Sequence, residues 1–433
     1  MEYRKVFIPV IVILSFCTVL YGQNTALNKK GERINELKRN YFEGKYKEAS
    51  LVYIDNSDSL SAEEYYYLGL TNNCLYNFEA AADYLQKANL LEPSNTGYEY
   101  ELAKVFLQLG RTKPAGERFA NILKREPEYV PVLFDAGTLD FSQKKYRDAV
   151  GKFKKVTKIA PSNFLAYYNL ARSYFLLEPQ TAFSDSVSVY LSVCTSINPD
   201  YLPAIEMLAN WDMNHKFYDQ ARILYLRAAD KYPEREEYLF YAGLCRENEG
   251  EYRKALVFFD EAIAKNSKDY RYWDHLGFSY YKLNSFDSAV VSYKKAVELD
   301  EENPSHYLNL AYSYVKADSS DQAVKTFEAA AVKMHPEIIA QVYSEIGTVY
   351  YGKNDFRNAA KAYRTAVLYN PKSITDLYFG AISEEQINNF KDALAGYKKA
   401  LELLKNTLPK EELEKDKRYN PLKKRIAFLT KKK

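Results

Sequence analysis

Small, aromatic and other apolar residues recur along this chain with the spacing of amphipathic helices. In residues 270–304, YRYWDHLGFSYYKLNSFDSAVVSYKKAVELDEENP, a first group of such positions is spaced three and four apart, as on one face of a helix. The residues on this first face are Trp273, Leu276, Gly277 and Tyr280. The residues on a second face, after the interrupting segment KLNSF, are Ala289, Tyr293, Ala296 and Val297. The stretch therefore predicts two helices joined by a short turn.

This two-helix pattern repeats with a period of about 34 residues. The small residues in matching surroundings are Ala81, Ala115, Ala149, Ala221, Ala255, Ala289, Ala323, Ala359 and Ala393. Val187 fills the place between Ala149 and Ala221, where one unit is four residues longer than the others. A second register, seven residues later, is Ala88, Ile122, Val156, Cys194, Ala228, Ala262, Ala296, Ala330, Ala366 and Ala400. Registers that keep one period over most of the chain predict an array of helix pairs.

The order of residue types within each unit resembles the tetratricopeptide repeat. An aromatic residue is followed by Leu-Gly and Tyr, and then by Ala, an aromatic residue, Ala and Pro, as in YWDHLGFSY and SAVVSYKKAVELD. The resemblance implies an all-α fold, an α-solenoid in which about eleven helix-turn-helix repeats over residues 31–405 form a right-handed superhelix. A single helix pair leaves one face uncovered, so each pair needs its neighbours for stability. The apolar stripe of Leu422, Ile426 and Leu429 predicts a capping helix within the basic segment 406–433.

The first 22 residues differ from the rest of the chain. A short positive start, MEYRK, precedes the apolar run VFIPVIVILSFCTVLY, which is short for a membrane span. This pattern predicts a signal peptide over residues 1–22, cut between Gly22 and Gln23, and a linker over residues 23–30. The alternative is an uncleaved N-terminal membrane anchor. Gln after the cut resembles envelope proteins of Bacteroidota, so we expect an exported protein of the periplasm or envelope.

The resemblance also implies where a partner binds, because the first helix of each repeat lines the concave groove of such a superhelix. The residue after the leading aromatic, and the residue one turn later, should face this groove. The candidate groove residues are Tyr66, Tyr100, Lys104, Phe134, Tyr168, Arg172, Phe240, Phe278 and Tyr312. Aromatic rings with polar neighbours suit an extended peptide. They also suit sugars, and a third reading is that the rings only pack against the next helix.

The sequence offers little that indicates catalysis. None of the four histidines has a second ligand at helix spacing, and no HExxH, CxxC or phosphate-binding glycine loop occurs. We therefore expect no enzyme activity, no metal and no cofactor. A formal net charge of +3 gives no electrostatic argument for nucleic acid. Residues 405–433 carry 11 Lys or Arg against 4 Asp or Glu, so this tail is a candidate for contact with an anionic surface.

These observations favour a protein-interaction scaffold of the cell envelope, whose repeats bind a protein or peptide partner in the groove. The alternative is a glycan-binding module that uses the same aromatic residues. Three cysteines remain after the expected cut, Cys74, Cys194 and Cys245, and their wide spacing favours single thiols packed in the core over a disulfide framework.

Overall fold

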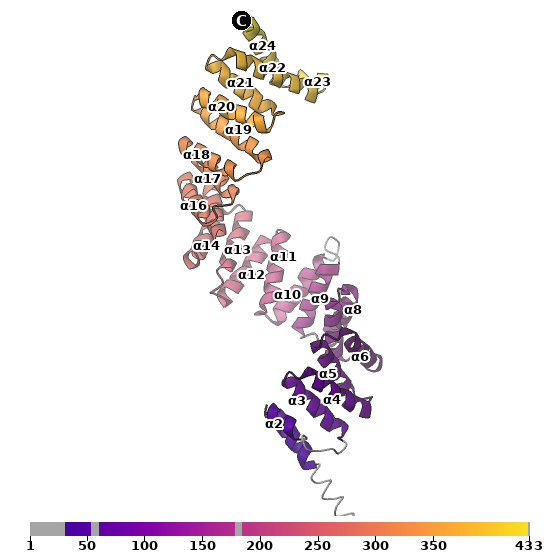
Figure 1. The fold of residues 1–433 in the computed structure, drawn as a ribbon. Helices are drawn as coiled ribbons and strands as arrows, with labels where there is room; N and C mark the ends of the chain where they lie inside the picture. Colours follow the sequence, from indigo (N-terminus) through magenta and orange to yellow (C-terminus); the bar gives the residue numbers. More distant parts are fainter. Residues whose placement is uncertain (1–30, 53–59, 178–183, 432–433) are drawn as a thin grey trace, which may run out of the picture. The chain divides into compact units, whose positions relative to one another are not determined.

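The computed structural model describes residues 31–52, 60–177 and 184–431, and every regular element in these ranges is a helix (Figure 1). The chain divides into an N-terminal unit, residues 1–204, and a C-terminal unit, residues 205–433. The predicted signal peptide (residues 1–22) and linker (residues 23–30) lie outside the described residues. In the part that is described, none of the helices combines the length and the apolar character that crossing a membrane requires.

The N-terminal unit contains a helical segment over residues 31–42 and the helices that follow it. These are α2 (Tyr46–Leu51), α3 (Ala62–Cys74), α4 (Phe78–Leu91), α5 (Thr96–Gln108), α6 (Thr112–Arg125), α7 (Val130–Ser142), α8 (Tyr146–Ile159), α9 (Phe164–Leu177) and α10 (Ser184–Ile197).

The C-terminal unit begins within α11 (Leu202–Asn214). The later helices are α12 (Tyr218–Lys231), α13 (Glu237–Asn248), α14 (Tyr252–Lys265), α15 (Tyr270–Lys282), α16 (Phe286–Leu299), α17 (Pro304–Lys316), α18 (Ser320–Val332), α19 (Pro336–Gly352), α20 (Phe356–Tyr369), α21 (Ile374–Gln386), α22 (Phe390–Thr407), α23 (Lys410–Leu413) and α24 (Tyr419–Lys431).

The described helices form eleven successive pairs, from residues 31–42 with α2 to α21 with α22. Within each unit most helices pack against the next helix along the chain, and first helices of consecutive pairs, such as α3 and α5 or α15 and α17, also touch (Figure 1). This arrangement confirms the all-α solenoid of helix pairs that the period predicted.

The two small-residue registers form the core of the stack. All nine alanines of the first register, from Ala81 to Ala393, have no exposed surface, and every member of the second register is at most 1% exposed. Their small size lets neighbouring helices approach closely. At Gly243 the approach is so close that an added Cβ would lie 2.5 Å from the ring of Phe259. Cys194 and Cys245 are buried free thiols, in agreement with single cysteines packed in the core.

A residue in the left-handed backbone region joins the two helices of almost every pair. In the turn KLNSF this residue is Asn284, with φ 59°. The amide of Ser285 donates to the carbonyl of Tyr280 at 2.9 Å, and that of Asn284 donates to Tyr281 at 3.0 Å, which is the hydrogen-bond pattern of a Schellman motif. The residues with this conformation in the described turns are Gly44, Tyr76, Gly110, Lys144, Lys216, Gly250, Asn284, Asp318, Asn354 and Asn388.

The last helix closes the C-terminal unit. Leu422 and Leu429 of α24 are at most 2% exposed and join the cluster that contains Tyr397 and Leu404 of α22, with Ile426 at its edge. The predicted stripe of α24 thus covers the apolar face that the final pair would otherwise expose, and the expected capping helix is confirmed.

Candidate functional site

Six of the predicted groove residues lie on the first helices of the N-terminal unit. We call this set the first-helix surface: Tyr66 of α3, Tyr100 and Lys104 of α5, Phe134 of α7, and Tyr168 and Arg172 of α9. All six side chains are half-buried, so each retains some surface for a partner while it also contacts neighbouring helices. The contacts fall into two polar clusters and two purely aromatic ones.

The first polar cluster is centred on Tyr100. Its hydroxyl donates to Asp135 Oδ2 of α7 at 2.8 Å, and the amino group of Lys104 lies 5.3 Å from the centre of its ring. Lys104 also pairs with Glu101 at 3.0 Å. Burial raises the pKa of the Asp135 carboxyl, and the nearby Tyr100 hydroxyl and Lys104 ammonium only partly oppose this. The cluster therefore presents an ammonium group and carboxylates beside an aromatic ring.

The second polar cluster is centred on Arg172. Its guanidinium lies 4.5 Å from the ring centre of Phe141 in α7 and 5.4 Å from that of Tyr168, and it donates to the amide oxygen of Asn169 at 3.4 Å. The ring of Tyr168 also meets Tyr201 edge to face, with centroids 5.1 Å apart. Helix α7 thus contributes to both clusters, because it supplies Asp135 to the first and Phe141 to the second.

Tyr66 and Phe134 belong to clusters of aromatic rings. The ring of Tyr66 lies 4.7 Å from that of Tyr98 in α5, and burial raises the pKa of its hydroxyl. The ring of Phe134 meets that of Phe153 in α8 edge to face at 5.7 Å. These two residues thus join neighbouring helices, as the packing alternative expected, although part of each ring stays exposed.

In the C-terminal unit the prediction for Phe240 must be corrected. The ring is only 3% exposed, because it is enclosed by Phe259 of the same pair and by Tyr272 and His275 of the next. A side chain this buried offers a partner almost no surface. Phe240 is a core residue of the stack and not a groove residue.

Phe278 and Tyr312 are half-buried and are packed by different neighbours. The ring of Phe278 meets Tyr252 edge to face at 6.1 Å, with the amino group of Lys282 5.1 Å from its centre. Burial, together with Glu345, raises the pKa of the Tyr312 hydroxyl to about 12, and its ring meets that of Phe327 at 5.2 Å. The two residues lie on α15 and α17, and these ring contacts are to the second helices α14 and α18.

Acidic and polar residues hold consecutive first helices together in this unit. Tyr238 donates to Glu206 at 2.5 Å, His306 bonds to Asp274 at 3.1 Å, and Ser344 donates to Asp376 at 2.5 Å. Glu206, Asp274 and Ser344 occupy the register position that holds Tyr66, Tyr100, Phe134 and Tyr168 in the N-terminal unit. In the described residues no group of three or more His, Cys, Asp or Glu could hold a metal ion.

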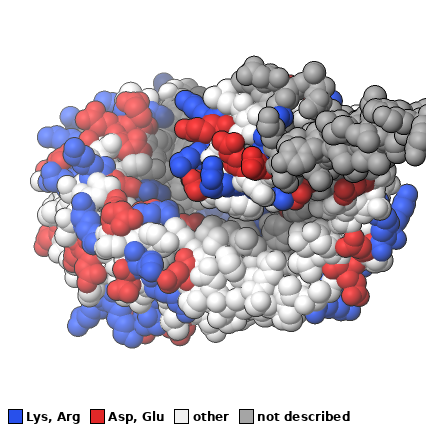
Figure 2. All heavy atoms as spheres, turned by 90° about the horizontal axis from the view of Figure 1, so that it is seen from below, with Lys and Arg blue, Asp and Glu red and all other residues white. Residues whose placement is uncertain are grey.

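Asp135 is the residue of the first polar cluster that the sequence reasoning missed. It directly follows the candidate Phe134 and lies 35 positions after Tyr100. A comparison of adjacent repeats could have found this pair, because it places a carboxylate about one period after a tyrosine in consecutive first helices. Figure 2 shows Lys and Arg intermixed with Asp and Glu over part of one face, beside a broad uncharged area.

Comparisons with known proteins agree with the repeat pattern. Family models of the tetratricopeptide repeat match residues 207–270 and 340–373, and a model described as TPR repeat matches residues 277–318. No curated protein sequence gives a significant match.

Three solved structures illustrate the structural likeness. A crystal structure of MamA is 21% identical, with 39% of this chain and 91% of that chain covered and a TM-score of 0.36. YrrB, described as a TPR protein with an unusual peptide-binding site, is 17% identical, with 41% and 91% covered and a TM-score of 0.37. The C-terminal part of a TPR repeat-containing protein from Cytophaga hutchinsonii is 19% identical, with 57% and 98% covered and a TM-score of 0.49.

Proposed function

We propose that this chain, of which family models of the tetratricopeptide repeat match residues 207–270, 277–318 and 340–373, is a non-catalytic scaffold that binds a protein partner through the first-helix surface of its N-terminal unit. An extended segment of the partner would run across α5, α7 and α9. The two polar clusters on these helices would contact it, and the aromatic rings between them would cover its apolar side chains.

The observation that carries this proposal is the cluster of Tyr100, Asp135 and Lys104. It places a hydrogen-bond acceptor and an ammonium group beside a half-buried ring. The peptide backbone offers one donor and one acceptor per residue, so such a cluster can fix the register of an extended chain. The ring adds contact area at a small cost in conformational entropy.

Glycan binding is the weaker candidate because the rings on this surface are already occupied. A sugar stacks on the open face of an aromatic ring. Here Lys104 lies over the ring of Tyr100, Arg172 lies over that of Tyr168, and the ring of Tyr66 packs on that of Tyr98. A peptide can use the ring edges and the charged groups, whereas a sugar would have to displace them.

We extend the proposal to the cell envelope on the basis of the sequence alone. The apolar run before Gly22 supports export to the periplasm or envelope, with an N-terminal anchor as the alternative. Residues 405–433 would add an electrostatic contact to an anionic surface. Fractionation of cells, with mass spectrometry of the N-terminus of the recovered chain, distinguishes a cleaved exported protein from an anchored one, and recovery in the cytosol would contradict both.

Site-specific crosslinking tests the binding surface. A photo-crosslinking residue is placed at Lys104, whose side chain is 41% exposed, and as a control at the exposed Lys124 of α6. We expect a protein adduct in intact cells from position 104 only, and its loss when Tyr100→Ala and Tyr168→Ala are added. Equal adducts from both positions, or an adduct that survives the two alanine changes, would refute binding at this surface.

A further inference from the structure

Helix α6 departs from most other second helices at two positions on one face, although α10 and α18 also begin with a small polar residue, serine. Eight described second helices begin with Tyr or Phe: α2, α4, α8, α12, α14, α16, α20 and α22. Helix α6 begins with Thr112. Four residues later it carries Gly116, where six other pairs have a buried apolar residue. These residues are Ala82, Val150, Val290, Val324, Ala360 and Leu394.

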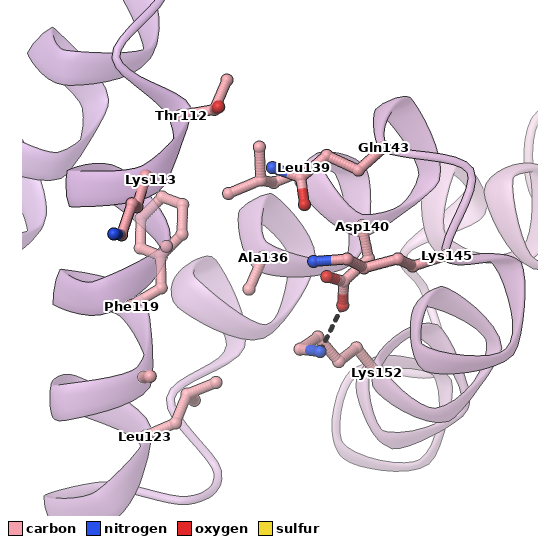
Figure 3. Close-up of a pocket in the computed structure, with 12 residues that line it drawn as sticks. Thr112, Lys113, Phe119, Leu123, Ala136, Leu139, Asp140, Gln143, Lys145 and Lys152 are labelled. Carbon is pink, nitrogen blue, oxygen red and sulfur yellow. Dashed lines mark hydrogen bonds and ion pairs between the residues drawn. The ribbon is translucent and has the colours of Figure 1, made fainter.

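An open space lies beside α6 where Thr112 and Gly116 replace the usual larger side chains. Residues four apart lie one above the other on a helix, so Thr112 and Gly116 leave the same strip without bulky side chains. A hollow of about 460 Å³ lies here between α6, α7 and α8 (Figure 3). Leu123 and Leu139 form part of its apolar wall. We call it the α6–α7 hollow, and its volume is within the range of pockets that hold small ligands or single side chains.

Positive charge surrounds this apolar space. Lys113 comes from α6, and Lys145 and Lys152 come from the opposite wall, next to Asp140 (Figure 3). Lys152 pairs with Asp140, the one carboxylate in the lining, and this leaves the ammonium groups of Lys113 and Lys145. Lys113 and Lys145 are both exposed, and neither has an ion-pair partner among the residues that the structure describes. The hollow therefore combines an apolar interior with two uncompensated positive charges at its rim.

We propose that the α6–α7 hollow binds an acidic segment of a partner protein. An apolar side chain of that segment occupies the space left by Thr112 and Gly116, and an adjacent Asp or Glu pairs with Lys113 and Lys145. Charge complementarity selects this occupant, because a carboxylate bound by two ammonium groups forms strong hydrogen bonds. The inference rests on the proposal that the chain binds proteins, but it concerns a hollow that neither Tyr100 nor Tyr168 lines, although the ring of Tyr100 contacts Phe119 in its wall.

Filling the hollow tests this inference without weakening the fold. A Cβ at Gly116 would lie 3.5 Å from the nearest side-chain atom, on Leu139, which is ordinary van der Waals contact. Gly116→Leu should therefore keep or raise the Tm, because glycine is unfavourable inside a helix. Gly151→Leu is the matched control: it adds the same side chain to the exposed face of α8, where no atom lies within 4 Å.

The probe is a random library of twelve-residue peptides displayed on phage, selected in parallel on the full-length wild type, on both glycine variants and on the double variant Tyr100→Ala with Tyr168→Ala. We expect a class of peptides that Gly116→Leu loses and the other variants keep. Its members should share an apolar residue next to Asp or Glu. Their affinity should fall about tenfold with Lys113→Gln and Lys145→Gln together, as for loss of charged hydrogen bonds.

The other outcomes separate the two proposals. If every selected peptide is lost by the double tyrosine variant and none is lost by Gly116→Leu, the first-helix surface is supported and binding in the hollow is overturned. A class that depends on position 116 but lacks acidic residues also overturns the inference. If no selected peptide depends on position 116 while Gly116→Leu keeps its Tm, the α6–α7 hollow is not a peptide site.

Discussion

The first helices of the two units use one register position in different ways. In the N-terminal unit it holds Tyr66, Tyr100, Phe134 and Tyr168, which are half-buried rings, and among them Tyr100 donates a hydrogen bond to Asp135 of the next first helix. In the C-terminal unit it holds Glu206, Phe240, Asp274 and Ser344 in four of the pairs, and three of these accept or donate a hydrogen bond to the next first helix. The fourth, Phe240, is fully enclosed by rings.

Under the proposed function, this difference separates repeats that bind a partner from repeats that mainly hold the stack together. A hydrogen bond between Asp274 and His306 satisfies polar atoms that a partner would need, so this part of the stack has few groups left to offer. A ring contact such as that of Tyr168 with Tyr201 leaves ring edges and the nearby Arg172 accessible. The same helix position can therefore join two repeats or bind a partner, according to the side chain that occupies it.

The largest expected effect is on stability, from Phe240→Ala compared with Phe134→Ala. Removal of the enclosed ring of Phe240 should lower the free energy of unfolding of the C-terminal unit by about 3–5 kcal/mol, because a cavity remains. Removal of the half-buried ring of Phe134 should lower the free energy of unfolding by only about 1–2 kcal/mol. Urea unfolding, combined with hydrogen exchange of α7 and α13, measures both losses. Equal losses would show that the two units do not differ at this position.

A smaller effect concerns the pH dependence of the bond between Asp274 and His306. Burial lowers the pKa of His306, but its bonds to Asp274 and to Asp300 outweigh this and raise the pKa above its usual value. The protonated form then stabilises the fold at pH values below about 6.5, the ordinary pKa of histidine. This stabilisation, about 2 kcal/mol for a charged hydrogen bond, is lost as the pH rises through the raised pKa.

Hydrogen exchange of α15 and α17 between pH 5 and pH 9 measures this loss after correction for the intrinsic exchange rate. The other groups that face His306 are the amide of Asn303 and the ring of Tyr270. His306→Gln should remove the pH dependence, and a dependence that persists in this variant would assign it to other groups.

Removal of a single hydroxyl gives a third, matched comparison. Tyr238→Phe deletes the hydrogen bond to Glu206 and should lower the free energy of unfolding by about 1 kcal/mol, with no effect on partner binding. Hydrogen exchange of α11 and α13 reports the loss, and a pull-down with the crosslinked partner reports the binding. A change in binding would mean that the C-terminal unit also takes part in recognition.

The smallest effect on stability is expected for Tyr100→Phe. The hydroxyl of Tyr100 lowers the pKa of Asp135, which burial has raised, so its removal should raise that pKa further. NMR titration of the Asp135 carboxyl measures the shift. We expect a change in stability below about 1 kcal/mol and a several-fold loss of partner affinity, the opposite balance to Tyr238→Phe. An unchanged affinity would remove Tyr100 from the binding surface.

The helix pairs could be predicted from the sequence because packing repeats with the period. Ala289 and Ala296 are buried for the same reason as their counterparts in other units, so one interpretation applies along the whole array. The capping helix was equally predictable, because Leu422 and Leu429 form an apolar stripe that needs an apolar partner. Both features depend on the spacing of residues within one or two repeats, and this spacing can be read directly from the sequence.

The candidate site was less predictable because it depends on pairs of residues about one period apart. The burial of Phe240 follows from Tyr272 and His275 in the next unit, and the bond of Tyr100 follows from Asp135. A register position indicates where a side chain lies but not whether its neighbour covers it. The α6–α7 hollow, in contrast, is indicated by the sequence, because Thr112 and Gly116 both differ from the residue types usual at their positions.

The residues that adopt the left-handed backbone conformation between paired helices are sites at which the thermal stability of this protein can be raised. At Tyr76, Lys144 and Lys216 a side chain occupies a backbone region that glycine enters freely and that costs other residues about 1 kcal/mol each. These sites lie in different turns, so exchanging each for glycine should give separate increments that add. A more thermostable variant could thus be engineered entirely within the turns, without a change to the first-helix surface or to the residues that line the α6–α7 hollow.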